Sequence, residues 1–473
     1  MDPTALIGII SHLAGAGTTP SCEDLRGFRA HEVTVLEAEM LDNVCRLEGV
    51  VTPVEGSRIG FHLKLPQAGQ WNARLKMLGN GGYSSAIPLK GLEALSAAGY
   101  AAVATDTGHS GDDPNFVVGH PEALTDWASR AVHVTAGSAK AIVETYYGSP
   151  PEYSYFEGCS TGGHQAFSEV QRYPEDFDGV IAGAPGHNRI RLNAAFLNQF
   201  LVNRDPRQSE VAVLDQQSLR LLAKASLAVC DIDLSTPYID DPLSCKFDPA
   251  VIACDDQGTG PNCLTPKQVE VARTMYGGTR DPDTNELIYP GWLPGSEAGG
   301  PVPDHFPGWS LYWADTAKGN VPARQSFWRF WVFGDPTWTW ERADLGTDVA
   351  YALEMLGADV DATDTDISSF AEFGGKLLHY HGLADPVVSP RDSIAYHDAV
   401  TASLGESTAD FYRLFLLPGV EHCQGGAGPA DFSGQSVIED WVERGIPPDL
   451  IDVTYDGGDG SPIERLTPYN NGD

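Results

Sequence analysis

The chain has 473 residues, of which 42% are hydrophobic, so it is long enough for one large domain with a substantial insertion or for two domains. Its 65 acidic and 30 basic residues give a formal net charge of −35. This charge argues against nucleic-acid binding, because phosphate recognition needs a basic surface. No run of about 18 or more apolar residues occurs, so we expect no membrane-spanning helix.

The eight cysteines indicate the compartment. Their even number and several short separations favour disulfides and an oxidising environment, and no C-x-x-C pair suggests a zinc ribbon or a redox motif. The first seventeen residues are mildly apolar but lack a basic segment, which makes them a poor signal peptide. We therefore expect a secreted protein whose signal has been removed.

Strands and helices alternate along the first part of the chain. The patterns predict strands within 47–65 and at 73–78, 100–105, 153–157 and 179–182, with helices at 90–98, 127–147 and 162–173. The same alternation resumes late, with strands at 376–380 and 410–416 and a helix at 436–443. This order predicts a mostly parallel sheet with helices on both faces.

The intervening segment, residues 196–371, has a different composition. It carries four of the eight cysteines and seven of the ten tryptophans. We interpret it as a lid domain inserted over the end of the sheet, with residues 1–195 and 372–473 forming the catalytic domain.

A nucleophile motif lies between a predicted strand and a predicted helix. Residues 158–162 read Gly-Cys-Ser-Thr-Gly and match G-x-S-x-G in the context that this motif requires. A tight strand-to-helix turn leaves no room for side chains beside Ser160 and exposes its hydroxyl. It also directs the backbone N–H of Thr161, at the helix N-terminus, toward a developing oxyanion. The bland alternative is an ordinary glycine-rich turn.

An acid and a base follow two late strands. Asp385 lies in the loop after 376–380, and His422 lies in the glycine-rich loop after 410–416. Loops at the carboxyl edge of a parallel sheet converge, and α/β-hydrolases carry their catalytic residues in the order Ser, Asp or Glu, His. We therefore predict an α/β-hydrolase fold in which Asp385 orients His422. Four other histidines also follow or end strands and could lie near the site without being the base: His109, His187, His379 and His381.

Two cysteines adjoin the proposed nucleophile and base. Cys159 precedes Ser160, and Cys423 follows His422. If the two pair, their Cα atoms lie roughly 5.5 Å apart and the bridge links the two backbones. The alternatives are two unrelated buried thiols, or a thiol hydrolase that uses Cys159.

The Cys-Ser and His-Cys pairs with an intervening Asp resemble the tannase and feruloyl esterase family, which includes a mono(hydroxyethyl) terephthalate hydrolase. The resemblance covers about residues 22–445 and includes GNGG at 79–82, DTGH at 106–109, FDGVIAGAP at 177–185 and HGLAD at 381–385. It implies a Ser160, Asp385 and His422 triad and an oxyanion hole formed by backbone N–H groups of Thr161, Gly81 and Gly82. It also implies the disulfides Cys159–Cys423, Cys22–Cys45, Cys230–Cys245 and Cys254–Cys263.

The lid departs from the family at its calcium loop. Lids of the family usually bind calcium through a loop rich in Asp-Gly units, whereas residues 230–245 contain Asp231, Asp233, Asp240 and Asp241 without those glycines. Calcium prefers six to eight oxygen ligands. The sequence therefore favours a solvated acidic loop, with structural calcium as the alternative, and it predicts no required cofactor or metal.

Residues 308–340 are dense in aromatic side chains. We expect Trp309, Trp313 and Phe327 to line an acyl pocket, where rings stack on a phenolic acid, and Arg324 to approach a substrate carboxylate. The alternative is a lid core with surface arginines.

Together these features predict a serine esterase that acts on small aromatic esters such as feruloyl or galloyl esters. A general carboxylesterase for aliphatic or polyester-fragment esters is the alternative. A non-catalytic binding protein on a hydrolase scaffold is a third reading, and the oligomeric state is left open.

Overall fold

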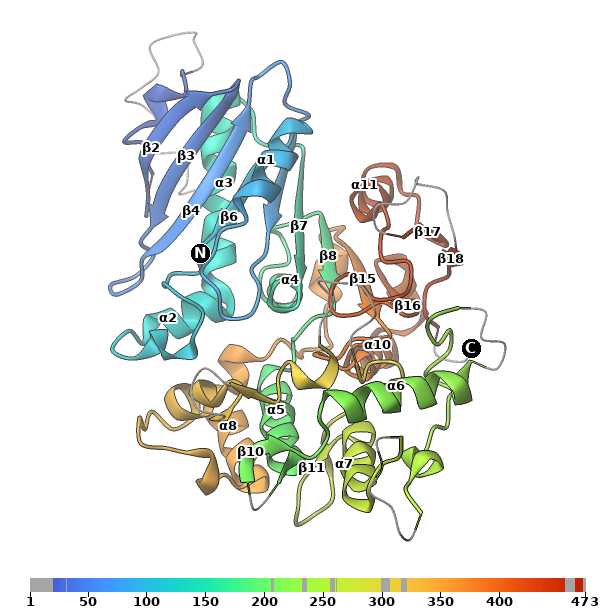
Figure 1. The fold of residues 1–473 in the computed structure, drawn as a ribbon. Helices are drawn as coiled ribbons and strands as arrows, with labels where there is room; N and C mark the ends of the chain where they lie inside the picture. Colours follow the sequence, from blue (N-terminus) through green and yellow to red (C-terminus); the bar gives the residue numbers. More distant parts are fainter. Residues whose placement is uncertain are drawn as a thin grey trace.

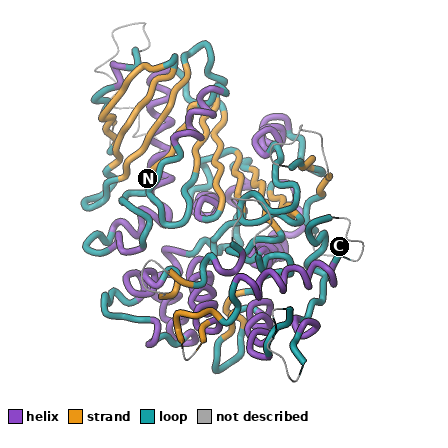
Figure 2. The backbone as a smooth tube through the Cα atoms, viewed as in Figure 1, coloured by secondary structure: helices purple, strands orange, loops and turns teal. Residues whose placement is uncertain are grey.

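A ten-stranded sheet forms the centre of the protein. The computed structural model describes residues 20–30, 32–205, 208–231, 236–255, 260, 262–298, 307–315, 321–455 and 464–470. The strand order is β1-β2-β3-β4-β6-β5-β7-β8-β15-β16. Figure 2 shows the strands gathered in one layer with helices on both sides.

The sheet has an antiparallel and a parallel part. The antiparallel strands are β1 (Arg29–Ala30), β2 (Val33–Leu41), β3 (Val44–Val51) and β4 (Ile59–Pro66). The parallel strands are β6 (Ala101–Thr105), β5 (Arg74–Leu78), β7 (Tyr153–Cys159), β8 (Gly179–Gly183), β15 (Lys376–Gly382) and β16 (Tyr412–Leu417). The expected α/β-hydrolase fold with a mostly parallel sheet is confirmed.

Each predicted strand of the parallel part is present within two residues of its expected bounds. Strand β2 was not anticipated. It joins β3 through Asp42 and Asn43, which both have positive φ (52° and 64°) and so make the tight hairpin turn that matches the twist of the two strands.

Helices cover both faces, and alternate strand residues explain how. On one face, α3 (Ala131–Tyr147), α4 (Thr161–Arg172) and α10 (Pro390–Leu404) pack on a core that includes Val103, Val180 and Leu377. On the other face, α11 (Gly434–Arg444) packs on Ile181 and Leu378, and α1 (Leu89–Ala97) packs on Ala102 and Ala104. Such alternation is expected for strands buried on both sides.

The predicted helix at 127–147 is divided. The regular helix α3 begins at Ala131, and α2 (Glu122–Thr125) and a π-helical turn (Asp126–Arg130) precede it. The π turn places Trp127, which is 1% exposed, against Tyr83 at a ring separation of 5.1 Å.

The inserted segment contains α5 (Arg189–Asn203), α6 (Gln216–Cys230), α7 (Pro266–Gly277) and α8 (Leu345–Val360), which lie together below the sheet in Figure 1. It also contains three short strand pairs. They are β9 (Arg204–Asp205) with β10 (Gln208–Ala212), β11 (Thr279–Arg280) with β12 (Leu287–Tyr289), and β13 (Ala314–Asp315) with β14 (Val321–Pro322). Helix α5 begins seven residues before the expected boundary at 196. The helix α9 (Ser368–Glu372) spans the other boundary and packs on the main core through Phe370.

All eight cysteines form disulfides, so Cys159 has no free thiol with which to act as a nucleophile. The pairs are those that the family resemblance implies: Cys22–Cys45, Cys159–Cys423, Cys230–Cys245 and Cys254–Cys263. None of the described helices combines the length and apolar character that a membrane span requires.

Gly137 in α3 and Gly148 just after it provide a matched test of how backbone conformation affects stability. Gly148 ends the helix with φ of 80°, whereas Gly137 lies in its exposed middle with nothing within 4 Å of an added Cβ. Gly148→Ala should lower the free energy of unfolding by about 1 kcal/mol, and Gly137→Ala should raise it by about 0.5–1 kcal/mol. Thermal unfolding of both variants checks this, and equal shifts would contradict it.

The buried imidazole of His397 predicts a loss of stability in acid. Burial lowers its pKa to about 4, so the folded chain excludes a proton that the unfolded histidine, with a pKa of about 6.5, binds as the pH falls. Stability should therefore decrease between pH 6.5 and 4, and His397→Gln should make that decrease shallower by up to about 1.4 kcal/mol per pH unit. Denaturant unfolding across this range is the measurement, with exposed His120→Gln as the control.

Candidate active site

Ser160 occupies a sharp turn between β7 and α4. Its backbone has φ of 63° and ψ of −114°, a conformation that a residue with a side chain rarely adopts. Its N–H donates to the Gly183 carbonyl at 3.0 Å, which holds the turn against β8. A Cβ on Gly158 would lie 2.5 Å from the backbone of Gly162, so the close approach requires glycine. This is the strained turn that G-x-S-x-G motifs form.

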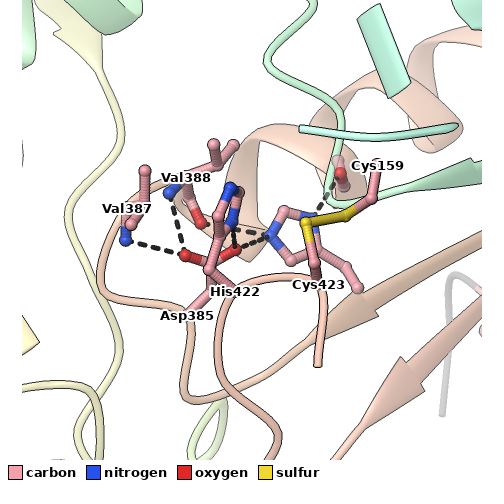
Figure 3. The surroundings of a disulfide bond; sticks show 8 residues. Cys159, Asp385, Val387, Val388, His422 and Cys423 are labelled. Atoms are coloured by element: carbon pink, nitrogen blue, oxygen red, sulfur yellow. Dashed lines mark hydrogen bonds and ion pairs between the residues drawn. A yellow bond between two sulfur atoms is a disulfide. The ribbon is translucent and has the colours of Figure 1, made fainter. Parts of the chain in front are cut away.

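The disulfide Cys159–Cys423 joins this turn to the loop after β16. The two Cα atoms are 5.8 Å apart although 264 positions separate them in the sequence. Since consecutive Cα atoms lie about 3.8 Å apart, Ser160 and His422 are held on neighbouring backbone segments. Figure 3 shows the His422 ring between this disulfide and Asp385.

Asp385 accepts hydrogen bonds on both carboxylate oxygens. Oδ2 accepts from Nδ1–H of His422 at 2.7 Å, and Oδ1 accepts from the backbone N–H groups of Val387 and Val388 at 2.7 and 2.9 Å. The side chain is fully buried. Burial alone would raise its pKa, but the interactions with His422 and His381 outweigh burial and lower the pKa below its ordinary value. Asp385 therefore stays ionised and fixes the His422 tautomer that carries its proton on Nδ1.

A second histidine also contacts Asp385. Nε2 of His381 lies 3.1 Å from Asp385 Oδ2 and 3.1 Å from the Val388 carbonyl. A carbonyl only accepts, so Nε2 carries the proton and Nδ1 accepts from the Ser393 hydroxyl at 2.7 Å. Ser393 in turn accepts from Nε2–H of His379 at 3.0 Å, and Nδ1 of His379 accepts from the Tyr412 hydroxyl.

The hydrogen bonds that run from Tyr412 through His379 and Ser393 to His381 fix which nitrogen of each imidazole carries the proton. Burial lowers the pKa of His379 well below its ordinary value, so that imidazole is neutral. The sequence left His381 open as a core or a cleft residue. The structure shows it buried, with its Nε2 beside the same carboxylate oxygen of Asp385 that His422 contacts.

His109 and His187, which the sequence also placed near the site, have other hydrogen-bond partners. His109 interacts with the Tyr83 carbonyl at 2.8 Å, and Nδ1 of His187 donates to the Pro185 carbonyl at 3.1 Å. Among the described residues, only His422 and His381 are hydrogen-bonded to Asp385 through their rings.

The residues expected to form an oxyanion hole come from two adjoining segments. The Gly79–Gly82 turn packs on the first turn of α4, since the Asn80 N–H donates to the Gln165 side chain at 2.9 Å. A Cβ on Gly162 would lie 3.2 Å from the Asn80 carbonyl oxygen. Gly81 and Gly82 therefore lie in a segment that contacts the helix N-terminus carrying Thr161, whose side chain is buried.

The four lid residues expected near substrate lie in different settings. Trp309 is 3% exposed and donates to Ser296, and Phe327 is fully buried beside Trp331, so both rings pack within the protein. Trp313 is half-buried and stacks on Phe200 at 5.9 Å.

Arg324 contacts the Gly82 turn of the catalytic domain. Its guanidinium lies 5.2 Å from the Tyr83 ring centre, and its Nη2 lies 3.3 Å from the position of a Cβ on Gly82. It also donates to the Tyr312 hydroxyl at 3.3 Å. Tyr83 was not singled out in the sequence. The signal was its place directly after GNGG.

The acidic loop of the lid does not present a calcium-ligand set within the described residues. The carboxylate of Asp240 accepts from Thr236, and that of Asp241 accepts from the backbone of Ser244. Asp233 lies outside the described residues. No group of three or more acidic, histidine or cysteine side chains that could hold a metal occurs in the part of the chain described.

Known proteins share this architecture and sequence. A sequence model of the family "Tannase and feruloyl esterase" matches residues 45–467. An uncharacterized esterase of Xanthomonas campestris pv. campestris is 33% identical over 90% of this chain and 79% of its own, and a probable feruloyl esterase B-1 of Aspergillus flavus is 32% identical over 89% and 81%.

Solved structures agree with this assignment. An esterase from Aspergillus oryzae superposes with a TM-score of 0.83 at 28% identity, covering 95% of this chain and 96% of its own. Feruloyl esterase B from the same organism has the same fold, with a TM-score of 0.83 at 24% identity over 93% of each chain. The chain therefore belongs to the tannase and feruloyl esterase family and is a carboxylic ester hydrolase.

Proposed function

We propose that the protein hydrolyses esters of aromatic acids with Ser160 as nucleophile, His422 as base and Asp385 as the residue that orients the base. The observation that carries this proposal is the joint placement of His422. Its ring donates to Asp385 at 2.7 Å, and its backbone is tied through Cys423 to the turn that bears Ser160.

The chemistry is acyl transfer through a covalent ester. His422 takes the Ser160 proton while the serine oxygen attacks the ester carbonyl, and backbone N–H groups of Thr161, Gly81 and Gly82 stabilise the oxyanion. The carbon–oxygen bond to the alcohol then breaks, and the alcohol leaves with the proton held by His422. Water repeats the sequence and releases the acid, which regenerates Ser160.

Two lines of support favour an aromatic acyl group. Several relatives are named feruloyl esterases, and one neighbour of the same fold is a tannin acyl hydrolase from Aspergillus niger, with a TM-score of 0.76 at 21% identity over 93% of this chain and 89% of its own. Tyr83 and Tyr312 stand beside Arg324 next to the Gly82 turn, and Trp313 belongs to the same lid segment. Rings and one cation at that position suit a phenolic acid.

Export remains part of the proposal. Four disulfides in one chain are typical of proteins that fold in an oxidising compartment. A small ester is the only partner that the proposal requires. The prediction that no cofactor is required, with structural calcium in the lid as the alternative, can be tested by metal analysis of the purified protein.

Replacement of the nucleophile is the direct test. Ser160→Ala should lower kcat by at least about 10⁴-fold while the melting temperature stays close to that of the wild type. Wild-type protein should react with a fluorophosphonate probe at Ser160, and the variant should not. Ser138→Ala, on α3, is the control and should keep full activity. Esterase activity that survives Ser160→Ala would reject the triad, and an unreactive wild-type serine would favour a binding protein.

The acyl preference is tested with methyl esters, because a shared methanol leaving group isolates the acid portion. Methyl ferulate or methyl gallate should exceed methyl butyrate in kcat/KM by at least about tenfold. A butyrate ester turned over equally well would favour a general carboxylesterase. Steady-state rates at one pH and salt concentration are the measurement.

A further inference from the structure

Arg189 places a buried positive charge beside the nucleophile turn. It is the first residue of α5, its side chain is 5% exposed, and its Nη2 donates to Oγ1 of Thr161 at 3.0 Å. Its Nε is buried and makes no hydrogen bond. Among the described carboxylates, none lies within 4.0 Å of this guanidinium.

Packing alone is a weak explanation for this arginine. Burial lowers the pKa of the guanidinium, but arginine titrates so far above neutrality that it remains charged. A buried cation with no carboxylate in contact is destabilising unless other groups replace its water, and Asp361 attracts Arg189 only from a greater distance. The ring faces of Trp127 and Tyr83, with centres 5.2 and 5.7 Å away, supply part of that replacement.

The contacts of Arg189 reach both segments of the proposed oxyanion hole. Thr161 supplies one backbone N–H, and its hydroxyl accepts the hydrogen bond from Arg189. Tyr83, whose ring faces the guanidinium, directly follows Gly81 and Gly82, the source of the other N–H groups. A positive charge at this place attracts an oxyanion more strongly than it attracts a neutral ester carbonyl.

We propose that Arg189 is a positioning residue of the oxyanion hole, which holds Thr161 through its hydroxyl and supplies a permanent positive charge behind the N–H donors. The inference rests on the proposed role of Ser160 and adds a residue to that reaction. The competing role is direct binding of a carboxylate carried by the substrate, and the two roles differ in their kinetics.

The first experiment is a double-mutant cycle on methyl ferulate, a neutral ester. Arg189→Met and Thr161→Val should each lower kcat by about 10- to 100-fold with KM changed less than about threefold, because a transition-state interaction is lost. The two losses should not add in the double variant, because they break the same hydrogen bond. Arg189→Lys keeps the charge and should recover part of the rate.

Arg191→Met provides the matched control. Arg191 lies on the same helix two residues later, and among the described residues no hydrogen bond or ion pair joins it to either donor segment. It should keep wild-type kcat. Melting temperatures show whether each variant folds, and if Arg189→Met does not, Thr161→Val and Arg189→Lys still measure the interaction.

A second readout separates electrostatics from structure. A phenyl trifluoromethyl ketone forms an anionic tetrahedral adduct with an active serine, so Arg189→Met should weaken its inhibition about as much as kcat falls, while inhibition by the product acid ferulate falls much less. Equal weakening of both inhibitors, or unchanged kcat in Arg189→Met, would overturn the proposal.

The substrate-binding role gives a different pattern. A loss confined to KM for monomethyl terephthalate, which carries a carboxylate, with methyl ferulate unaffected, would assign Arg189 to substrate recognition and overturn the present inference. Fluorophosphonate labelling of the wild type keeps the hypotheses apart. Labelling at Ser160 with an inert Arg189→Met substitution rejects only the role of Arg189, whereas absence of labelling rejects the proposed function as well.

Discussion

The bond between Cys159 and Cys423 connects two loops that the sheet alone would leave apart. In the strand order, β16 lies three positions from β7, a distance of about 14 Å at the usual strand spacing. The loop after β16 runs back across the end of β15, where a Cβ on Gly382 would lie 2.3 Å from the Val420 carbonyl oxygen. The disulfide holds the end of that path. It closes a loop of 264 residues, worth roughly 5 kcal/mol in the chain-entropy model.

Hydrogen bonds to both carboxylate oxygens fix the position of the Asp385 side chain. Two backbone N–H groups and two imidazoles surround one carboxylate, and the fixed tautomers of His381 and His379 leave no alternative orientation for the donors. A buried carboxylate without these partners would resist ionisation. The orientation of the His422 ring is therefore fixed through a carboxylate that is itself held by buried groups.

Most of this arrangement could be predicted from the sequence. The alternation of strands and helices predicted the parallel sheet, and the order of Ser160, Asp385 and His422 placed all three at its carboxyl edge. Strand β2 was not predicted. It ends in an Asp-Asn turn, and the positive φ values of that turn cannot be inferred from composition. His381 resembled an ordinary strand residue, and only the fold shows that its ring reaches Asp385.

The direction of individual side chains could not be predicted from the sequence. Trp309 and Phe327 lie in an aromatic-rich segment as expected, but their rings face the interior, which the spacing of aromatics does not reveal. Arg189 was not singled out in the sequence. Its position shortly after the GAPGH segment that leaves β8 was the available signal, since loops at that edge of the sheet converge near Ser160.

Hydrogen bonds join the two ends of the inserted segment, at residues 187–190 and 361–362. Asp361 accepts from the Ile190 N–H at 3.0 Å, the Ala362 N–H donates to the His187 carbonyl, and Arg172 of α4 donates to the Asp361 carbonyl. The outgoing and returning chains are thus hydrogen-bonded to each other and to α4, the helix that follows Ser160. These bonds fix where the inserted segment leaves and rejoins the sheet domain. The same junction is a place at which the inserted segment of one relative could be exchanged for that of another while the sheet domain keeps its geometry.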